Sequence, residues 1–277
     1  MKNILSFDIE EWFHGVFQRN TSVPHVFRSD LNVPPLLDLL HEKGVKATFF
    51  VVGESLRDNR LLKRMVDDGH EIGFHTMDHK LLSEKTPDEL AYELRSFRAR
   101  VKDATGADCL GFRAPSFSLS KKTAWATECL AKEGYAYDSS IFPAKTPIYG
   151  NPGAPLTSYY MDREDPGSPG DSGVREFPLT VARYFGLNVP IAGGFYLRAI
   201  PEWLLGRMMR GSVGAGRPLV LYVHNWELDR SLPRYNLGFK ANTYCYHNQE
   251  ATWGRLVRLL EEFEFTTFAQ ALKESRQ

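Results

Sequence analysis

Short apolar runs alternate with longer amphipathic segments along the whole chain. The runs are almost uniformly apolar, which is typical of buried strands in a parallel sheet. They predict strands at residues 4–7, 47–52, 71–74, 110–112, 135–137, 219–223 and 266–268. The amphipathic segments predict helices at residues 34–42, 60–68, 121–133, 201–210 and 248–263, and a long helix that opens at Thr86.

This alternation implies parallel strands joined by crossover helices. The pattern runs from end to end, so we expect one barrel-like α/β domain over residues 1–277 and no second lobe. Residues 144–173 interrupt it and are rich in Pro, Gly, Asp and Tyr. A loop of this length in a compact domain is usually functional or else disordered, and we expect a lid-like loop here.

The charges balance: 34 Lys and Arg residues face 34 Asp and Glu residues, so the net charge is zero. This balance argues against a nucleic-acid partner that is bound through a basic field, and against a polybasic membrane anchor. No apolar run reaches the roughly 18 residues that a membrane span needs. We therefore expect neither nucleic acid nor a transmembrane segment.

Three cysteines, Cys109, Cys129 and Cys245, are present without a CxxC spacing. This set argues against a disulfide scaffold and fits a reducing compartment. The N-terminal apolar run is short and acids follow it from Asp8, which does not resemble a secretory signal. We expect a cytoplasmic protein.

Two histidines, His75 and His79, directly follow the predicted strand at residues 71–74. At a spacing of i and i+4 they would share one face of a helical turn and could hold one metal ion. Two ordinary surface histidines are the alternative. The position favours the metal, because sites in parallel α/β folds collect where strands end.

Asp8 and Glu10 end the first predicted strand and point to the same side of an extended chain. Two buried carboxylates need a counter-ion, for which a metal, an arginine or both would serve. Arg113 ends another predicted strand and is the candidate arginine. Asp138 and His224 end two more, so five strands finish in ionisable groups of complementary kind.

These motifs together resemble the carbohydrate esterase family 4 polysaccharide deacetylases, the NodB-homology group. Residues 6–10 (SFDIE) look like the first motif, and residues 69–79 (GHEIGFHTMDH) like the metal-binding histidine motif. Residues 44–53, 112–117, 134–143 and 221–224 look like the remaining motifs, in the family's order. Residues 192–198, 224–229 and 248–265 resemble a subgroup linked to bacterial exopolysaccharide and surface-glycan biosynthesis.

The resemblance implies a distorted (β/α) barrel with about seven parallel strands and a subgroup-type C-terminal extension at about residues 190–277. It also implies a metal-dependent hydrolase that removes N-acetyl groups from an amino sugar. One divalent metal is expected, zinc first, with cobalt, nickel, iron or manganese open. Glu10, His75 and His79 would be its ligands.

The remaining roles also follow from the resemblance. Asp8 would act as the base, held by Arg113, and His224 as the acid, oriented by Asp138. A backbone N–H near Ser116 or Phe117 would stabilise the oxyanion.

Two positions depart from the usual pattern. Ile9 stands where the family carries a second aspartate, so the carboxylate ligand is Glu10 or, alternatively, Asp8. Asn225 stands where the subgroup usually carries proline, and we expect little effect from it.

Several residues close to the motifs are expected to line the site, namely Trp12, His14 and Trp226. Tyr149, Tyr159 and Tyr160 in the long loop could offer flat faces to sugar rings. The sequence does not identify the sugar or its carrier, and it leaves open whether the protein forms a homo-oligomer. The alternative functions are an allantoinase-type cyclic amide hydrolase, a non-haem iron oxygenase and a non-catalytic glycan-binding relative.

Overall fold

A curled, mostly parallel sheet organises residues 2–15 and 23–275, the part of the chain that this computed structural model describes. Its strands follow the order β10-β1-β2-β3-β4-β5-β7-β6, and β11 pairs with β1. Strand pairs are parallel except for β6 with β7. The strands are β1 (Asn3–Ile9), β2 (Thr48–Val51), β3 (Glu71–Phe74), β4 (Gly111–Phe112), β5 (Tyr137–Asp138), β6 (Tyr159–Tyr160), β7 (Arg175–Glu176), β10 (Val220–His224) and β11 (Phe265–Thr266).

The sheet curls into the expected distorted barrel. Seven parallel strands run from β10 to β7, β11 adds an eighth, and antiparallel β6 lies at the edge. The segment after β7 reaches back to β10, where the Thr180 N–H donates to the Val220 carbonyl oxygen at 3.2 Å. The Val220 N–H donates in turn to Thr180 Oγ1 at 2.6 Å. These two bonds bridge the ends of the curled sheet.

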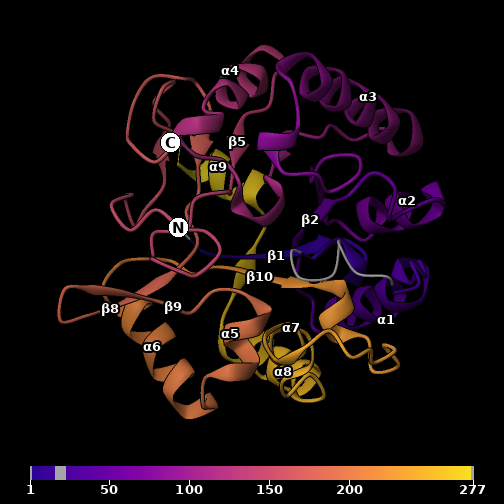
Figure 1. The fold of residues 1–277 in the computed structure, drawn as a ribbon, viewed down its shortest axis with the longest axis vertical. Coiled ribbons are helices and arrows are strands. Elements are labelled where there is room, and N and C mark those ends of the chain that lie inside the picture. Colours follow the sequence, from indigo (N-terminus) through magenta and orange to yellow (C-terminus); the bar gives the residue numbers. More distant parts are fainter. Residues whose placement is uncertain (1, 16–22, 276–277) are drawn as a thin grey trace.

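Helices surround the sheet (Figure 1). They are α1 (Ser29–Glu42), α2 (Asn59–Asp67), α3 (Pro87–Thr105), α4 (Trp125–Lys132), α5 (Gly194–Ala199), α6 (Glu202–Gly214), α7 (Phe239–Tyr246), α8 (Ala251–Glu262) and α9 (Phe268–Glu274). The sequence pattern predicted α2, α3, α4, α6 and α8 but missed α5, α7 and α9, which are eight residues long or shorter. No described helix is both long enough and apolar enough to cross a lipid bilayer.

Helix α1 begins five residues earlier than its prolines predict, at Ser29 instead of Pro34. The Glu11 carboxylate accepts the backbone N–H groups of Arg28 and Ser29, at 2.7 and 2.9 Å. Unpaired N–H groups at a helix start need such acceptors. The start of α1 is therefore fixed by a residue 17 positions away from Arg28, which local sequence rules do not include.

The barrel interior is filled with aromatic side chains from distant parts of the chain. Phe268 of α9 lies 5.2 to 5.5 Å, between ring centroids, from Tyr137, Phe177 and Phe50. In Figure 1, α9 lies within the ring of surrounding helices. The C-terminal segment is thus part of the barrel core.

Residues 144–173 pack on the barrel along part of their length. They contribute β6 and a single bridge between Met161 and Pro169, and Ala144 and Met161 are fully buried. A separate hairpin follows, formed by β8 (Val181–Tyr184) and β9 (Leu187–Pro190).

Candidate active site

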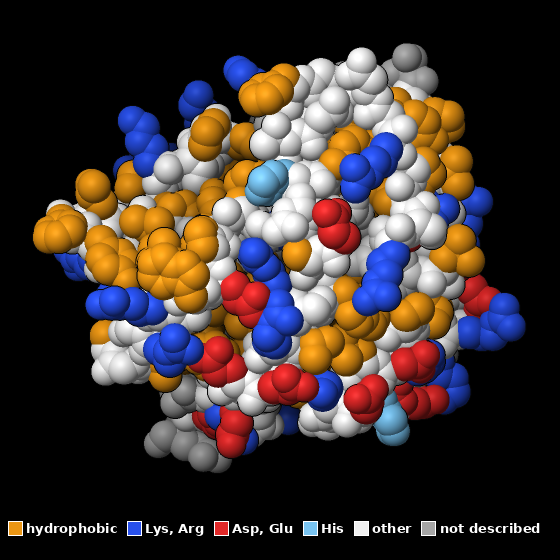
Figure 2. Space-filling model, turned by 90° about the horizontal axis from the view of Figure 1, so that it is seen from below, with side chains coloured by type: hydrophobic (Ala, Val, Ile, Leu, Met, Phe, Trp, Pro, Cys, Tyr) orange, Lys and Arg blue, Asp and Glu red, His pale blue; other side chains and the backbone are white. Residues whose placement is uncertain are grey.

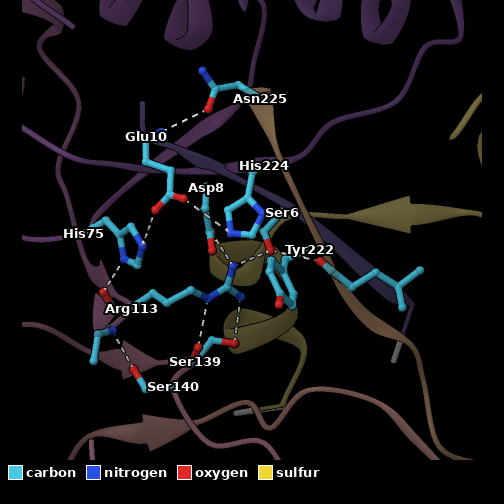
Figure 3. A network of polar contacts seen from close by, with 12 residues as sticks. Ser6, Asp8, Glu10, His75, Arg113, Ser139, Ser140, Tyr222, His224 and Asn225 are labelled. Atoms are coloured by element: carbon cyan, nitrogen blue, oxygen red, sulfur yellow. Dashed lines mark hydrogen bonds and ion pairs between the residues drawn. The ribbon is translucent and has the colours of Figure 1, made fainter. Parts of the chain in front are cut away.

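Polar side chains converge where β1, β3, β4 and β10 end (Figure 3). Asp8 of β1 pairs in register with His224 of β10 on one side and Phe50 of β2 on the other. His75 and Arg113 directly follow β3 and β4. The carboxyl ends of parallel strands meet at one edge, so residues up to 216 positions apart become neighbours there.

Three side chains form a compact donor set: Glu10, His75 and His79. Their ligand atoms lie within 4.8 Å of one another, and all three side chains are buried. Glu10 Oε2 lies 2.6 Å from His79 Nε2 and 3.8 Å from His75 Nε2. The two histidines are not on a helical turn as the spacing predicts. Left-handed backbone at Thr76 (φ 63°) and His79 (φ 53°) turns the chain and aims both rings at Glu10.

The hydrogen bonds of the two imidazoles fix which ring nitrogen faces Glu10. His75 Nδ1 donates to the Arg113 carbonyl oxygen at 2.6 Å, and His79 Nδ1 donates to the His14 carbonyl oxygen at 3.1 Å. Because a carbonyl can only accept, the proton is on Nδ1 in each ring. Both Nε2 lone pairs therefore point into the site, as in metal centres whose histidines are oriented by outer partners.

A divalent cation fits this donor set. Glu10 Oε2 is buried, and the His79 ring is the one group that faces it at hydrogen-bond distance among the described residues, with Nε2 at 2.6 Å. Without a cation or a proton between them, the carboxylate oxygen and the imidazole nitrogen would repel each other. Two imidazoles and one carboxylate are the protein ligands of many catalytic zinc sites.

The charges of the site also shift its pKa values. Burial raises the pKa of Glu10, but the neighbouring His79, His224 and His75 outweigh it and lower that pKa well below its usual range. Burial lowers the pKa of His75 to about 4, so its imidazole is neutral near pH 7. An ionised carboxylate and a neutral imidazole are the protonation states that metal binding requires.

Asp8 lies against Arg113, as the sequence predicts. Asp8 Oδ1 accepts from Arg113 Nη1 at 2.6 Å, and both side chains are almost fully buried. The guanidinium also donates to Ser6 Oγ and to the carbonyl and hydroxyl oxygens of Ser139. Arg113 is therefore fixed in place and holds Asp8 at the floor of the site.

His224 is oriented by Glu227, which the sequence analysis did not single out. His224 Nδ1 lies 2.9 Å from Glu227 Oε2, and Glu227 Oε1 accepts from Arg198 at 2.9 Å. Burial raises the pKa of Glu227, but Arg198 and His224 lower it to about 2. Burial lowers the pKa of His224, but the charges of Glu10 and Glu227 raise it to about 9. The i, i+3 spacing of His224 and Glu227 is the signal that could have revealed the pair.

The expected pairing of Asp138 with His224 is wrong. The Asp138 carboxylate accepts from Ser140 N–H and Ser140 Oγ, at 2.9 and 2.7 Å. It also lies against Glu176 of β7, and burial with that neighbour raises the pKa of Glu176 well above its usual range. No hydrogen bond or ion pair joins Asp138 to His224 among the described residues, and His224 Nδ1 lies against Glu227 instead.

Asn225 holds the backbone of Glu10, one of the three candidate metal ligands. Its Oδ1 accepts the Glu10 backbone N–H at 3.0 Å, and its Nδ2 donates to Ser29 Oγ and Asn32 Oδ1. Trp226 Nε1 donates to Glu10 Oε1 at 3.1 Å. Glu10 is thus held by the two residues after His224, and the proline typical of the subgroup would lack the amide of Asn225.

The site opens into a small pocket of about 30 Å³. Ser116, Phe117 and Trp226 line it as expected, and so do Ile148 and Tyr149 of the long loop. Tyr222 and Tyr244, which the sequence pattern did not predict, are also lining residues.

Two expected lining residues lie elsewhere. Trp12 is buried and stacks on Tyr235 at 5.2 Å, in a separate apolar cluster. The His14 ring bonds to Glu54 and to the Glu11 N–H, and its contribution to the site is the carbonyl that orients His79. The short turn Trp12–His14 directs both rings away from the pocket.

Two regions of the chain match families of known proteins. Residues 26–135 match the model of the polysaccharide deacetylase family, and residues 139–273 match a domain of unknown function, DUF3473. Over 92 residues, 33% of the chain, the sequence is 36% identical to a peptidoglycan-N-acetylglucosamine deacetylase of Listeria monocytogenes. Over 95 residues, also 33%, it is 39% identical to a chitooligosaccharide deacetylase of Rhizobium leguminosarum.

These alignments span only 20% and 40% of the two relatives' own lengths. The fold is similar to the crystal structure of a candidate polysaccharide deacetylase from Mycobacterium smegmatis. That similarity has a TM-score of 0.63 at 18% identity and covers 99% of this chain and 91% of the other. It shows that the barrel architecture is shared over the whole chain.

Proposed function

We propose that the chain, whose residues 26–135 match the polysaccharide deacetylase family, is a metal-dependent hydrolase that removes N-acetyl groups from an amino sugar in a bacterial polysaccharide or surface glycan. One observation carries the proposal: the Glu10, His75 and His79 donor set lies in one pocket with Asp8, which contacts Arg113, and with His224. Amide hydrolysis needs these parts, namely an electrophilic cation site, a base and an acid.

Glu10, His75 and His79 would hold one divalent cation, zinc in our proposal. A cation there would supply a Lewis acid that activates water and polarises the acetyl carbonyl. A set of three protein ligands would leave room for water at the cation, which distinguishes catalytic from structural zinc sites.

Asp8 would accept the proton of the attacking water. Its charge is stabilised by Arg113, whose other hydrogen bonds prevent it from moving away. A base with a fixed orientation needs no reorganisation when the proton arrives.

His224, the in-register neighbour of Asp8 on β10, would donate a proton to the leaving amine. Its Nδ1 is engaged by Glu227, so Nε2 is the nitrogen that faces Glu10 and the pocket. The Glu227 carboxylate would hold the ring in the protonated form until the carbon–nitrogen bond breaks. Proton delivery of this kind contributes about 10²–10⁴-fold in rate.

The oxyanion would be stabilised by the cation and by the Ser116 N–H. The Phe117 N–H donates to the Ala114 carbonyl oxygen at 3.0 Å, which leaves Ser116 as the donor that we assign. Ser116 and Phe117 both have left-handed backbone, at φ 50° and 53°. Such conformations cost energy and concentrate at functional sites.

We extend the proposal to exopolysaccharide or surface-glycan biosynthesis in the cytoplasm. The part of this assignment that concerns glycan biosynthesis is supported by residues 192–198, 224–229 and 248–265, which resemble the subgroup. These residues include Glu227, the partner of His224, and lie within the region that matches DUF3473.

Acetate release tests the proposal. The purified protein would be analysed for bound metal and then assayed on N-acetylated oligosaccharides, with an allantoin-type cyclic ureide as the competing substrate. We expect close to one zinc per chain and acetate from a glycan. Turnover of the ureide without acetate would favour the cyclic amide hydrolase, and glycan binding without turnover would favour a non-catalytic relative.

A further inference from the structure

The tip of the β8–β9 hairpin exposes a group of large apolar side chains: Tyr184, Phe185 and Leu187. Phe185 is fully exposed, and Leu187 is 71% exposed. Exposed apolar groups that gather in one place mark contact sites more often than scattered ones do. The hairpin tip is therefore a candidate contact site for another molecule.

The turn itself shows that Phe185 is unusual at its position. Tyr184 pairs with Leu187, so Phe185 and Gly186 form a two-residue turn in which both have positive φ, 49° and 80°. Such a turn favours Asn-Gly, and a bulky residue at its first position is disfavoured. The chain thus carries a bulky aromatic residue where folding alone favours asparagine.

Helix α6 packs against β8 and continues this surface. Its exposed side includes Trp203, 70% exposed, and Val213, with Arg207 between them in the sequence. In Figure 2 hydrophobic side chains gather at the left of the face, bordered by Lys and Arg, on the side where β8, β9 and α6 lie in Figure 1. We call the residues Tyr184, Phe185, Leu187, Trp203 and Val213 the hairpin–α6 surface.

Charge around this surface is one-sided although the whole chain is neutral. Residues 177–226 contain one acid, Glu202, and five arginines, of which Arg198 is buried and bound to Glu227, which leaves those at positions 183, 207, 210 and 217. Glu202 is paired with Arg258, and Arg210 with Glu262. Arg183 and Arg207 have no acidic partner among the described residues. The surface thus presents uncompensated positive charge beside aromatic side chains.

We propose that the hairpin–α6 surface docks the protein on an anionic phospholipid membrane. Aromatic rings enter the headgroup region while neighbouring arginines contact lipid phosphates, which is the chemistry of interfacial membrane attachment. A local group of arginines is compatible with zero net charge, because the potential of the membrane acts only within about a Debye length of the surface.

The hairpin is also linked to the catalytic pocket. The Asn188 Nδ2 of β9 donates to the Pro143 and Pro152 carbonyl oxygens, at 2.7 and 3.4 Å. The segment between these prolines carries Ile148 and Tyr149, which line the pocket. The hairpin therefore contacts the segment that carries these lining residues.

Vesicle co-sedimentation tests the proposal without any assay of activity. The full-length protein would be mixed with vesicles of phosphatidylcholine alone or with 30 mol% phosphatidylglycerol. We expect binding to the anionic vesicles that weakens at high salt. The variant Phe185→Asn creates the favoured Asn-Gly turn, so it should fold at least as well while losing about tenfold or more in vesicle affinity. Arg183→Glu should lose roughly fivefold or more.

Tyr92→Ser is the matched control, because Tyr92 is 68% exposed on α3, away from the hairpin. It should bind vesicles as the unaltered protein does. Analytical ultracentrifugation of the unaltered protein and Phe185→Asn addresses the competing occupant, a second copy of the chain. A dimer that Phe185→Asn dissociates, without vesicle binding, would overturn the proposal, as would equal binding by all variants.

Discussion

Glu227 Oε2 lies 2.9 Å from His224 Nδ1, and this contact gives the candidate acid an orienting partner on the same short turn. Arg198 lies on the other side of Glu227 and completes a buried chain of alternating charges. This row of charged side chains reaches the pocket at the His224 ring. Glu227 and Arg198 are thus expected to affect the pH dependence of turnover as well as its rate.

Replacing Glu227 should impair proton donation. In Glu227→Gln the ring of His224 loses a charged partner, and we expect kcat to fall by about tenfold to a hundredfold, part of the general-acid contribution. Glu227 helps to raise the pKa of His224, so its neutralisation lowers that pKa. The basic limb of the kcat profile should therefore move to lower pH, which a pH series on an acetylated oligosaccharide would measure.

Asp138→Asn is the matched comparison, because Asp138 is equally buried but contacts Ser140 and Glu176. It should leave the basic limb in place. A shift as large as that of Glu227→Gln would contradict our assignment of the orienting carboxylate.

Asp8→Asn should separate metal binding from chemistry. The substitution keeps the shape of the side chain but removes the base, while Glu10, His75 and His79 remain. We expect metal content to stay near that of the unaltered protein and turnover to fall by at least about a hundredfold. Metal analysis and acetate release measure the two quantities. An active Asp8→Asn protein would exclude Asp8 as the base.

Glu10→Ala should abolish stable metal binding. Its Oε2 is the atom that both imidazoles approach, and two histidines alone make a weak site. Metal analysis after dialysis should find little metal in the variant. Full occupancy would instead assign the ligand role to Asp8, the alternative that the first motif leaves open.

Asn225→Ala tests how much the outer contacts matter. It removes the acceptor of the Glu10 N–H and leaves that buried donor unpaired. Loss of such supporting contacts costs about 10–100-fold in metal affinity or activity. A competition titration with a chromophoric chelator gives the affinity. An unchanged value would agree with the expectation from sequence that the departure at this position has little effect.

The Glu176–Asp138 pair should make stability depend on pH. Burial raises the pKa of Glu176, so folding favours its neutral form. The resulting stabilisation is fully present below the pKa of the unfolded chain and is lost as the pH rises toward the folded value. In Glu176→Gln this loss should vanish, so the free energy of unfolding, measured in urea at pH 5 and pH 8, should vary less with pH. The exposed Glu128→Gln should show the unaltered dependence.

The sequence by itself determined the strands and the ends at which chemistry collects. Uniformly apolar runs specify buried parallel strands wherever they occur, and Asp8, His75, Arg113 and His224 follow four of them. Because parallel strands align their carboxyl ends, the convergence of these residues could be predicted without knowing any distance. The resemblance to polysaccharide deacetylases rests on the motifs at these strand ends.

Only the tertiary structure decided which partner each of these residues meets. Asp138 ends its strand as His224 does, but its carboxylate accepts from Ser140 and lies against Glu176. The partner of His224 is Glu227, three residues further along the chain. The Glu11 carboxylate accepts a backbone N–H at the start of α1, and the His14 carbonyl oxygen orients the ring of His79, which lies 65 residues further along the chain. Local patterns encode which way a side chain points from its own helix or strand. The pairing of residues on different elements depends on how these elements pack, and no short stretch of sequence contains that information.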